Sequence, residues 1–152
     1  MHGTRSMALR ALILALGLMA LGVSPAFAAK DVFIRTKPHV NVGTIQGKPV
    51  EIWFHAVAGL FDDGDAVGIL QLRLRGGESF VFRVTGGQAV VERNAVAEVV
   101  LAVERVGRGG ASVGESDLVI IRPSSTAADC LIYDFVGPEI HLESEGQLTL
   151  RK

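Results

Sequence analysis

The feature that most restricts the fold of this chain is the alternation of apolar and polar residues in short runs. In GILQLRLRGG, residues 68–77, every second residue from Leu70 is a leucine and the residues between are mostly polar. In SFVFRVTGG, residues 79–87, Phe80, Phe82 and Val84 recur at the same spacing. Alternation with a period of two is typical of strands that bury one face.

These two runs predict a β-hairpin around Gly76 and Gly77. Both apolar sets must lie on one face, because a slip of one residue would turn one strand inside out. Pairing Leu74 with Phe80 and Leu72 with Phe82 satisfies this condition. The loop would then have five residues, 75–79.

Similar apolar runs fill the chain after residue 30, and Gly, Asp, Ser and Pro interrupt them at short intervals. This punctuation predicts an all-β fold with a single domain. We expect an antiparallel β-sandwich, with a closed or partly open β-barrel as the alternative, since alternation does not distinguish the two. The expected strands are Asp31–Thr36, Val40–Ile45, Val50–Leu60, Ala66–Arg75, Phe80–Thr85, Gln88–Arg93, Val96–Val106, Leu118–Arg122, Cys130–Val136, Glu139–Glu143 and Gln147–Arg151.

The segment Val96–Val106 is open to two interpretations. Four of its valines fit helical spacing, with Asn94 as a cap before it and Gly107 after it. However, five of its eleven residues are Val, which is β-branched and prefers strands. We favour a strand and keep the helix as the alternative.

The first 28 residues have the layout of a secretory signal peptide. Arg5 and Arg10 are positive, the run 11–23 is apolar, and Ala26-Phe27-Ala28 is a small-x-small cleavage site. Cleavage there would leave one domain, residues 29–152, with no further membrane span. We therefore expect a periplasmic or secreted protein.

The charge balance of the mature chain argues against polyanionic partners. Of the 15 Lys and Arg, two leave with the signal, so 13 remain against 16 Asp and Glu, for a net charge of −3. A mildly acidic protein is not built to coat nucleic acid or anionic lipid.

Cys130 is the one cysteine, so an internal disulfide is excluded. It begins the apolar run CLIYDFV, where a thiol behaves as a small buried hydrophobe. The alternative is a disulfide between two chains, which would make a homodimer.

The stretch FDDGDAVG, residues 61–68, resembles a calcium loop only superficially. Its carboxylates lack the alternating spacing and the final Glu of an EF-hand loop. Asp-Gly between two apolar runs instead predicts a hairpin turn.

Residues 110–114 read Gly-Ala-Ser-Val-Gly, the G-x-S-x-G spacing of a nucleophile elbow. Asp134 and His141 follow Ser112 in the order of a hydrolase triad. That motif needs a strand before the Ser and a helix after it, whereas a strand-like run follows here. We do not expect an enzyme, and no cofactor is indicated.

A divalent metal site is the alternative function, either in a metal-binding protein or in a metal-dependent enzyme. No two histidines of the mature chain have the spacing of a known ligand pair, so such a site would be assembled from distant strands. Its candidate ligands are His39, His55, His141, Asp62 and Asp65.

The favoured function is a non-enzymatic binding or interaction module carried on the sandwich. Trp53 would share a strand face with Glu51 and His55, and a large aromatic side chain on a polar face predicts a contact anchor. Arg73 and Arg83 would stand side by side on the outer face of their hairpin and attract an acidic glycan or protein. The candidate binding residues are Trp53, His55, Arg73 and Arg83.

Overall fold

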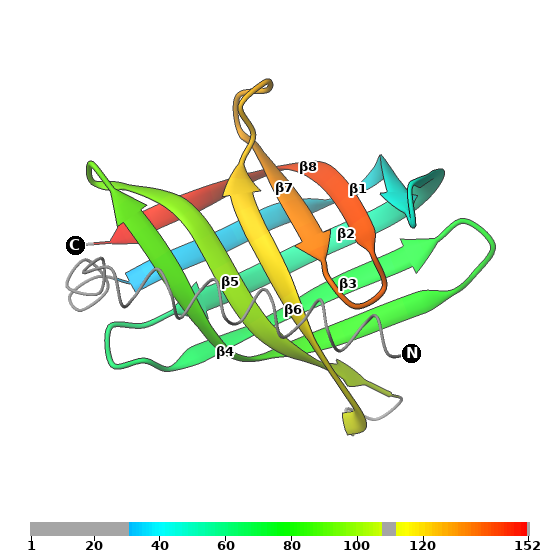
Figure 1. Ribbon diagram of the computed structural model, residues 1–152, viewed down its shortest axis with the longest axis horizontal. Helices are drawn as coiled ribbons and strands as arrows, with labels where there is room; N and C mark the ends of the chain where they lie inside the picture. Colours follow the sequence, from blue (N-terminus) through cyan, green and yellow to red (C-terminus); the bar gives the residue numbers. More distant parts are fainter. Residues whose placement is uncertain (1–30, 108–111, 152) are drawn as a thin grey trace.

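The fold is a closed antiparallel barrel in which each strand pairs with the next along the chain (Figure 1). The computed structural model describes residues 31–107 and 112–151. No helix in these residues is long and apolar enough to cross a membrane. The strands are β1 (Asp31–Ile45), β2 (Lys48–Leu60), β3 (Ala66–Leu74), β4 (Ser79–Glu92), β5 (Ala95–Val106), β6 (Ser112–Pro123), β7 (Cys130–Phe135) and β8 (Ile140–Arg151).

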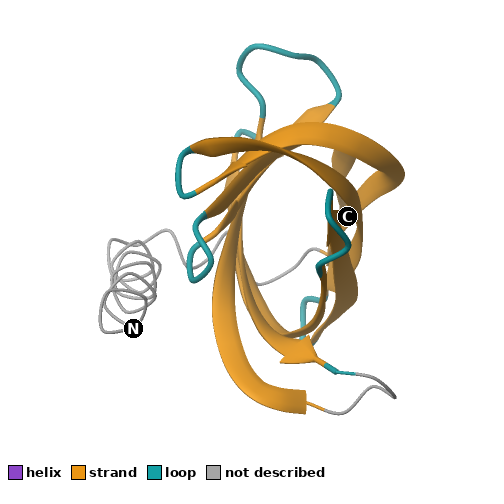
Figure 2. Ribbon diagram, turned by 90° about the vertical axis from the view of Figure 1, so that its right-hand side faces the viewer, coloured by secondary structure: helices purple, strands orange, loops and turns teal. Residues whose placement is uncertain are grey.

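The all-β prediction is confirmed, but the architecture is the barrel and not the favoured sandwich. The difference lies in the pairing of the first and last strands. Ile34 lies opposite Leu148 and Val32 opposite Leu150 in an antiparallel β1–β8 ladder, which closes the sheet. A closed sheet has one interior rather than two facing layers, as the end-on view shows (Figure 2).

Three of the predicted breaks are bends inside long strands. The register shifts after Thr36 in β1 and after Val84 in β4, and β8 runs through Gly146 without a break. Such bulges and glycines let strands bend around a barrel. A Cβ on Gly146 would lie 2.5 Å from the carbonyl oxygen of Arg35, so only glycine permits this close approach of β1 and β8.

The hairpin of β3 and β4 forms as predicted, but in a register shifted by two residues. Leu72 lies opposite Phe80 and Leu70 opposite Phe82. Both apolar sets still face inward, as the alternation requires. The loop is tighter than expected because the N–H of Leu74 donates to the carbonyl of Glu78 over 2.8 Å.

The ambiguous segment is a strand, since Ala95–Val106 forms β5 and pairs with both β4 and β6. Its register with β4 shifts twice, with Thr85 as the extra residue in β4 and Ala97 as the extra residue in β5. The β-branched valines therefore predicted this segment correctly, and the helical spacing of its apolar residues did not.

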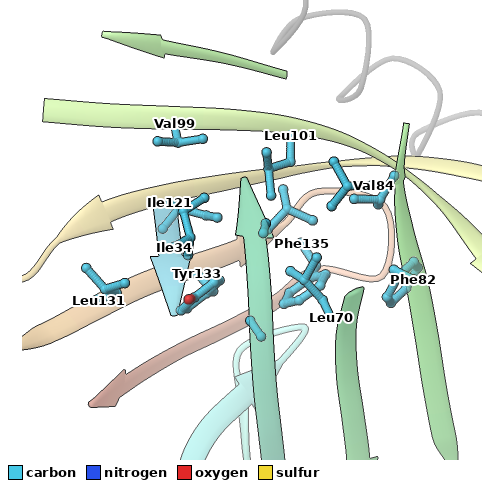
Figure 3. Packing of buried hydrophobic residues seen from close by; sticks show 14 of the residues in the cluster. Ile34, Leu70, Phe82, Val84, Val99, Leu101, Ile121, Leu131, Tyr133 and Phe135 are labelled. Atoms are coloured by element: carbon cyan, nitrogen blue, oxygen red, sulfur yellow. The ribbon is translucent and has the colours of Figure 1, made fainter. Parts of the chain in front are cut away.

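The interior of the barrel is filled with apolar side chains (Figure 3). Phe54, Tyr133 and Phe135 are at most 1% exposed, and Phe54 packs edge-on against Tyr133 with ring centroids 4.6 Å apart. The barrel is thus a packed core and not a pore. Few polar side chains are buried in the described part, and Thr36 is one: its Oγ1 accepts the N–H of Ala56 over 2.8 Å beside the bulge in β1.

The two ends of the barrel differ. One end, called here the cleft end, carries the β2–β3 loop, the β4–β5 turn, the β6–β7 loop and the C-terminal end of β8. The other end carries the β1–β2 turn, the β3–β4 loop and the β7–β8 turn. Figure 1 shows the β6–β7 loop standing clear of the barrel wall, with the β4–β5 turn and the end of β8 at its left.

Candidate functional site

A cleft of about 560 Å³ opens at the cleft end between β5 and β8. It exists because β7 is half as long as β8: their ladder stops where Cys130 lies opposite Glu145. Residues 94–96, 127–131 and 146–150 line it, together with Pro123 and Ser124. This cavity is named the β5–β8 cleft below.

The floor of the β5–β8 cleft is apolar. Val96 and Leu131 are core residues that line it, and Leu148 and Leu150 are partly buried and pack against the same core. Its rim is polar, with Ser124, Asp129 and backbone groups of β8. A concave apolar site with a few polar groups at the mouth of a barrel is a common form of binding site.

A smaller hollow of about 290 Å³ adjoins the cleft on the outer side of β1 and β8. Arg35 and Lys37 line it together with Asp129 and Glu145. Two positive and two negative side chains balance one another, so this hollow does not select for ligand charge.

Cys130 lies on the wall of the cleft and is partly exposed, so it is not the buried thiol that its apolar run predicted. Desolvation raises the pKa of its thiol, and the carboxylates of Glu143, Glu145 and Asp129 raise it further. A raised pKa reduces the thiolate fraction, so Cys130 is a poor nucleophile.

FDDGDAVG forms a turn between β2 and β3, as predicted. The N–H of Phe61 donates to the carbonyl of Asp65 over 2.8 Å, and Gly64 has a φ of 92°. Asp65 N–H donates to Asp63 Oδ1 over 2.9 Å, and Asp62 N–H to Asp31 Oδ1 over 3.1 Å. The carboxylates of Asp63 and Asp31 therefore bind the turn backbone.

The candidate metal ligands are spread over the molecule. His39 lies at the β1 bulge, His55 on the outer face of β2, and His141 near the start of β8. Asp62 and Asp65 are in the β2–β3 loop at the cleft end. In the part of the chain that the structure describes, no three His, Cys, Asp or Glu side chains are placed to hold a metal ion together.

The structure does bring Asp134 and His141 together, with Asp134 Oδ1 2.5 Å from His141 Nδ1. The pair lies on the outer face of the barrel, and Asp134 also binds Arg122. Ser112 opposes Val106 at the start of β6, whereas Asp134 opposes Ile120, eight residues along that strand. At about 3.3 Å per residue this separation prevents a triad. Residues 108–111, which include part of the motif, lie outside the described residues.

Three of the four candidate binding residues cluster on the outer face of β2 and β3. Trp53 lies opposite Arg73, whose guanidinium carbon is 5.5 Å from the indole centroid, and His55 is next to Trp53 on the same face. Arg83 lies elsewhere, because the register shift places it opposite Ile69, and it pairs with Glu104. The expectation that Arg73 and Arg83 stand side by side is therefore wrong.

Asp117 is a charged residue inside the barrel, 9% exposed, at the end opposite the cleft. Its Oδ1 accepts the backbone N–H of Gly137 over 2.7 Å, while its Oδ2 is buried without a partner in the described residues. Desolvation raises the pKa of this carboxyl, and the backbone hydrogen bonds of Leu118 and Gly137 oppose the rise. It ties the β7–β8 turn to β6.

Sequence reasoning missed the β5–β8 cleft. The signal that could have found it is the short apolar run 130–136 beside the much longer segment 139–151, which reveals a short strand next to a long one. Comparison of the chain with protein-family models, with curated proteins and with solved structures finds no match.

Proposed function

We propose that this chain is an exported, non-enzymatic binding protein whose ligand site is the β5–β8 cleft. The observation that carries the proposal is the cleft itself: about 560 Å³ with an apolar floor of core residues and a polar rim. A small, largely apolar ligand or segment matches such a site, because it buries apolar surface and leaves its polar groups at the rim.

The properties of the cleft lining support binding rather than catalysis. The thiol of Cys130, which lines the cleft, has a raised pKa. The groups around it are carboxylates, and not the base or cation that would activate a nucleophile. Asp117, whose carboxyl also has a raised pKa, lies at the opposite end of the barrel. The perturbed groups therefore do not converge on one reacting centre.

The polarity of the wall supports a protein that works in water. The interior is apolar, and the outer face carries ion pairs such as Arg122 with Asp134 at 3.2 Å and Arg75 with Glu51 at 3.4 Å. The outer face also exposes aliphatic side chains such as Val67 and Ile69, but a membrane-spanning barrel has a polar lumen, whereas this interior is apolar. Export itself rests on the signal peptide, which lies outside the described residues.

The test uses N-phenyl-1-naphthylamine, a neutral apolar dye whose fluorescence rises in apolar sites. We expect saturable binding to the mature protein and at least tenfold weaker binding to Ala128→Trp, which places an indole in the cleft. Val42→Trp is the matched control, because Val42 is 74% exposed on β1 and does not line the cleft. Equal binding by all three proteins would overturn the proposal.

A further inference from the structure

In the part of the chain that the structure describes, the half of β8 that lines the β5–β8 cleft has a strand partner on one side only. Residues 31–36 of β1 pair with residues 146–151 of β8 on one side. On the other side the ladder with β7 ends at Glu145. Among the strands that the structure describes, β1 is thus the sole partner of this half of β8, over about 16 Å at the usual rise per residue.

The direction of the backbone groups on this edge follows from one hydrogen bond. The N–H of Gly146 donates to the carbonyl oxygen of Asp129 over 2.8 Å, so it points away from β1 and toward the line of β7. Backbone groups alternate in direction along a strand. The N–H and C=O groups of Leu148 and Leu150 therefore point into the cleft, while those of Gln147 and Thr149 face β1.

The opposite wall of the cleft is also a strand edge. Ala95 and Val96 of β5 pair with Glu92 and Val91 of β4, but the ladder with β6 begins only at Val99. The cleft is therefore bounded by backbone on both sides and by apolar side chains below. Unpaired edge groups of this kind are templates for another strand.

We propose that the ligand of the β5–β8 cleft is an extended polypeptide segment that pairs with β8 along Leu148 and Leu150, beyond the hydrogen bond from Gly146 to Asp129, and continues the line of β7. This inference rests on the proposed function and names its ligand class. Alternate side chains of the segment would face Val96, Leu131 and Leu148, so they are apolar, and those between would face water. Main-chain bonds supply affinity and the apolar floor supplies selectivity.

Two other occupants match these features less well. A lipid or another hydrocarbon would cover the floor but would leave the N–H and C=O groups of the edge without partners. The β8 edge of a second copy is attached to its own barrel through β1, and the β4–β5 hairpin flanks the cleft and would obstruct that wide approach.

The test measures fluorescence anisotropy with a fluorescein-labelled peptide of alternating Thr and Val, six residues long, with a terminal Lys for solubility. The control peptide has the same sequence with every Val N-methylated, which removes strand hydrogen bonds but keeps the side chains. We expect the first peptide to bind and the N-methylated one to bind at least tenfold more weakly. This comparison needs no variant protein, so it does not depend on a variant folding.

The protein variant for the same test is Leu148→Pro, which removes an N–H that faces the cleft and spares those that face β1. Leu148→Val is its control, because it keeps the N–H. We expect at least tenfold weaker peptide binding by Leu148→Pro than by Leu148→Val. If the dye binds but the peptide does not, or both peptides bind equally, the strand inference is overturned and the proposed function stands. If neither dye nor peptide binds, both are overturned.

Discussion

Asp117 Oδ1 lies 2.7 Å from the backbone nitrogen of Gly137, and this hydrogen bond joins β6 to the turn between β7 and β8. The carboxyl group is inside the barrel, where an ionised group without full pairing is costly. Asp117 therefore stabilises the turn through its hydrogen bond and destabilises the folded state when its buried carboxyl is ionised. The two effects can be separated by substitution.

Gly137→Ala should loosen this anchor. The added Cβ would lie 2.8 Å from Asp117 Oδ1, so the carboxylate must move and give up its hydrogen bond. We expect the free energy of unfolding to fall by about 2 kcal/mol, measured by urea denaturation. Gly86→Ala is the control, because its nearest neighbour would be Ala102 Cβ at 3.9 Å, and it should leave stability unchanged or slightly raised. Equal effects of both substitutions would contradict the steric argument.

Asp117→Asn should change how stability depends on pH. Because the pKa of Asp117 is raised above 3.8 in the folded state, the unfolded chain ionises first as the pH rises, and the wild type loses stability across that window. The variant cannot ionise. We therefore expect its free energy of unfolding to improve relative to the wild type as the pH rises from below 3.8 through the folded pKa. Urea melts at several pH values check this, and a constant difference would rule it out.

Neighbouring positions on β2 should respond very differently to truncation. Phe54 is fully buried and packs against Tyr133, so Phe54→Ala should cost about 3–5 kcal/mol. Trp53 faces outward beneath Arg73, so Trp53→Ala should cost about 1 kcal/mol. Thermal and urea unfolding measure both values. Similar losses at the two positions would mean that the faces of β2 are assigned wrongly.

Cys130 should react slowly with iodoacetamide near neutral pH. Desolvation and three nearby carboxylates raise the pKa of its thiol, so little thiolate is present. Glu145→Gln removes the charge directly opposite Cys130 in the ladder and should increase the alkylation rate. Glu51→Gln, on β2 near the other end of the barrel, is the control and should leave the rate unchanged. A faster reaction of the wild type than of Glu145→Gln would contradict this assignment.

The sequence predicted the strands well and their continuity badly. Alternation identified β3, β5 and β7 nearly residue for residue, because a buried face needs an apolar side chain at every second position. Gly86, Gly87 and Gly146 fall between expected strands, although they lie inside β4 and β8. A local pattern does not tell a glycine that ends a strand from one that lets a strand bend around a barrel.

The candidate site depends on strand register, strand length and long-range strand pairing, which the alternation of apolar and polar residues does not predict. The separation of Arg73 and Arg83 follows from a register shifted by two residues, which keeps every side chain on its predicted face. The β5–β8 cleft follows from the different lengths of β7 and β8 and from the pairing of β8 with β1. That pairing joins residues between 95 and 120 positions apart in the chain, so no local sequence pattern predicts it.

Native-state hydrogen exchange of the β8 amides tests the free edge directly, read residue by residue by NMR on the mature protein. The N–H groups of Leu148 and Leu150 should exchange at least about tenfold faster than those of Gln147 and Thr149, which face β1. Addition of the Thr-Val peptide should then slow the exchange of Leu148 and Leu150. Uniform protection from Gln147 to Leu150, or the reverse alternation, would show that β8 has no free edge in the cleft and would contradict strand pairing there.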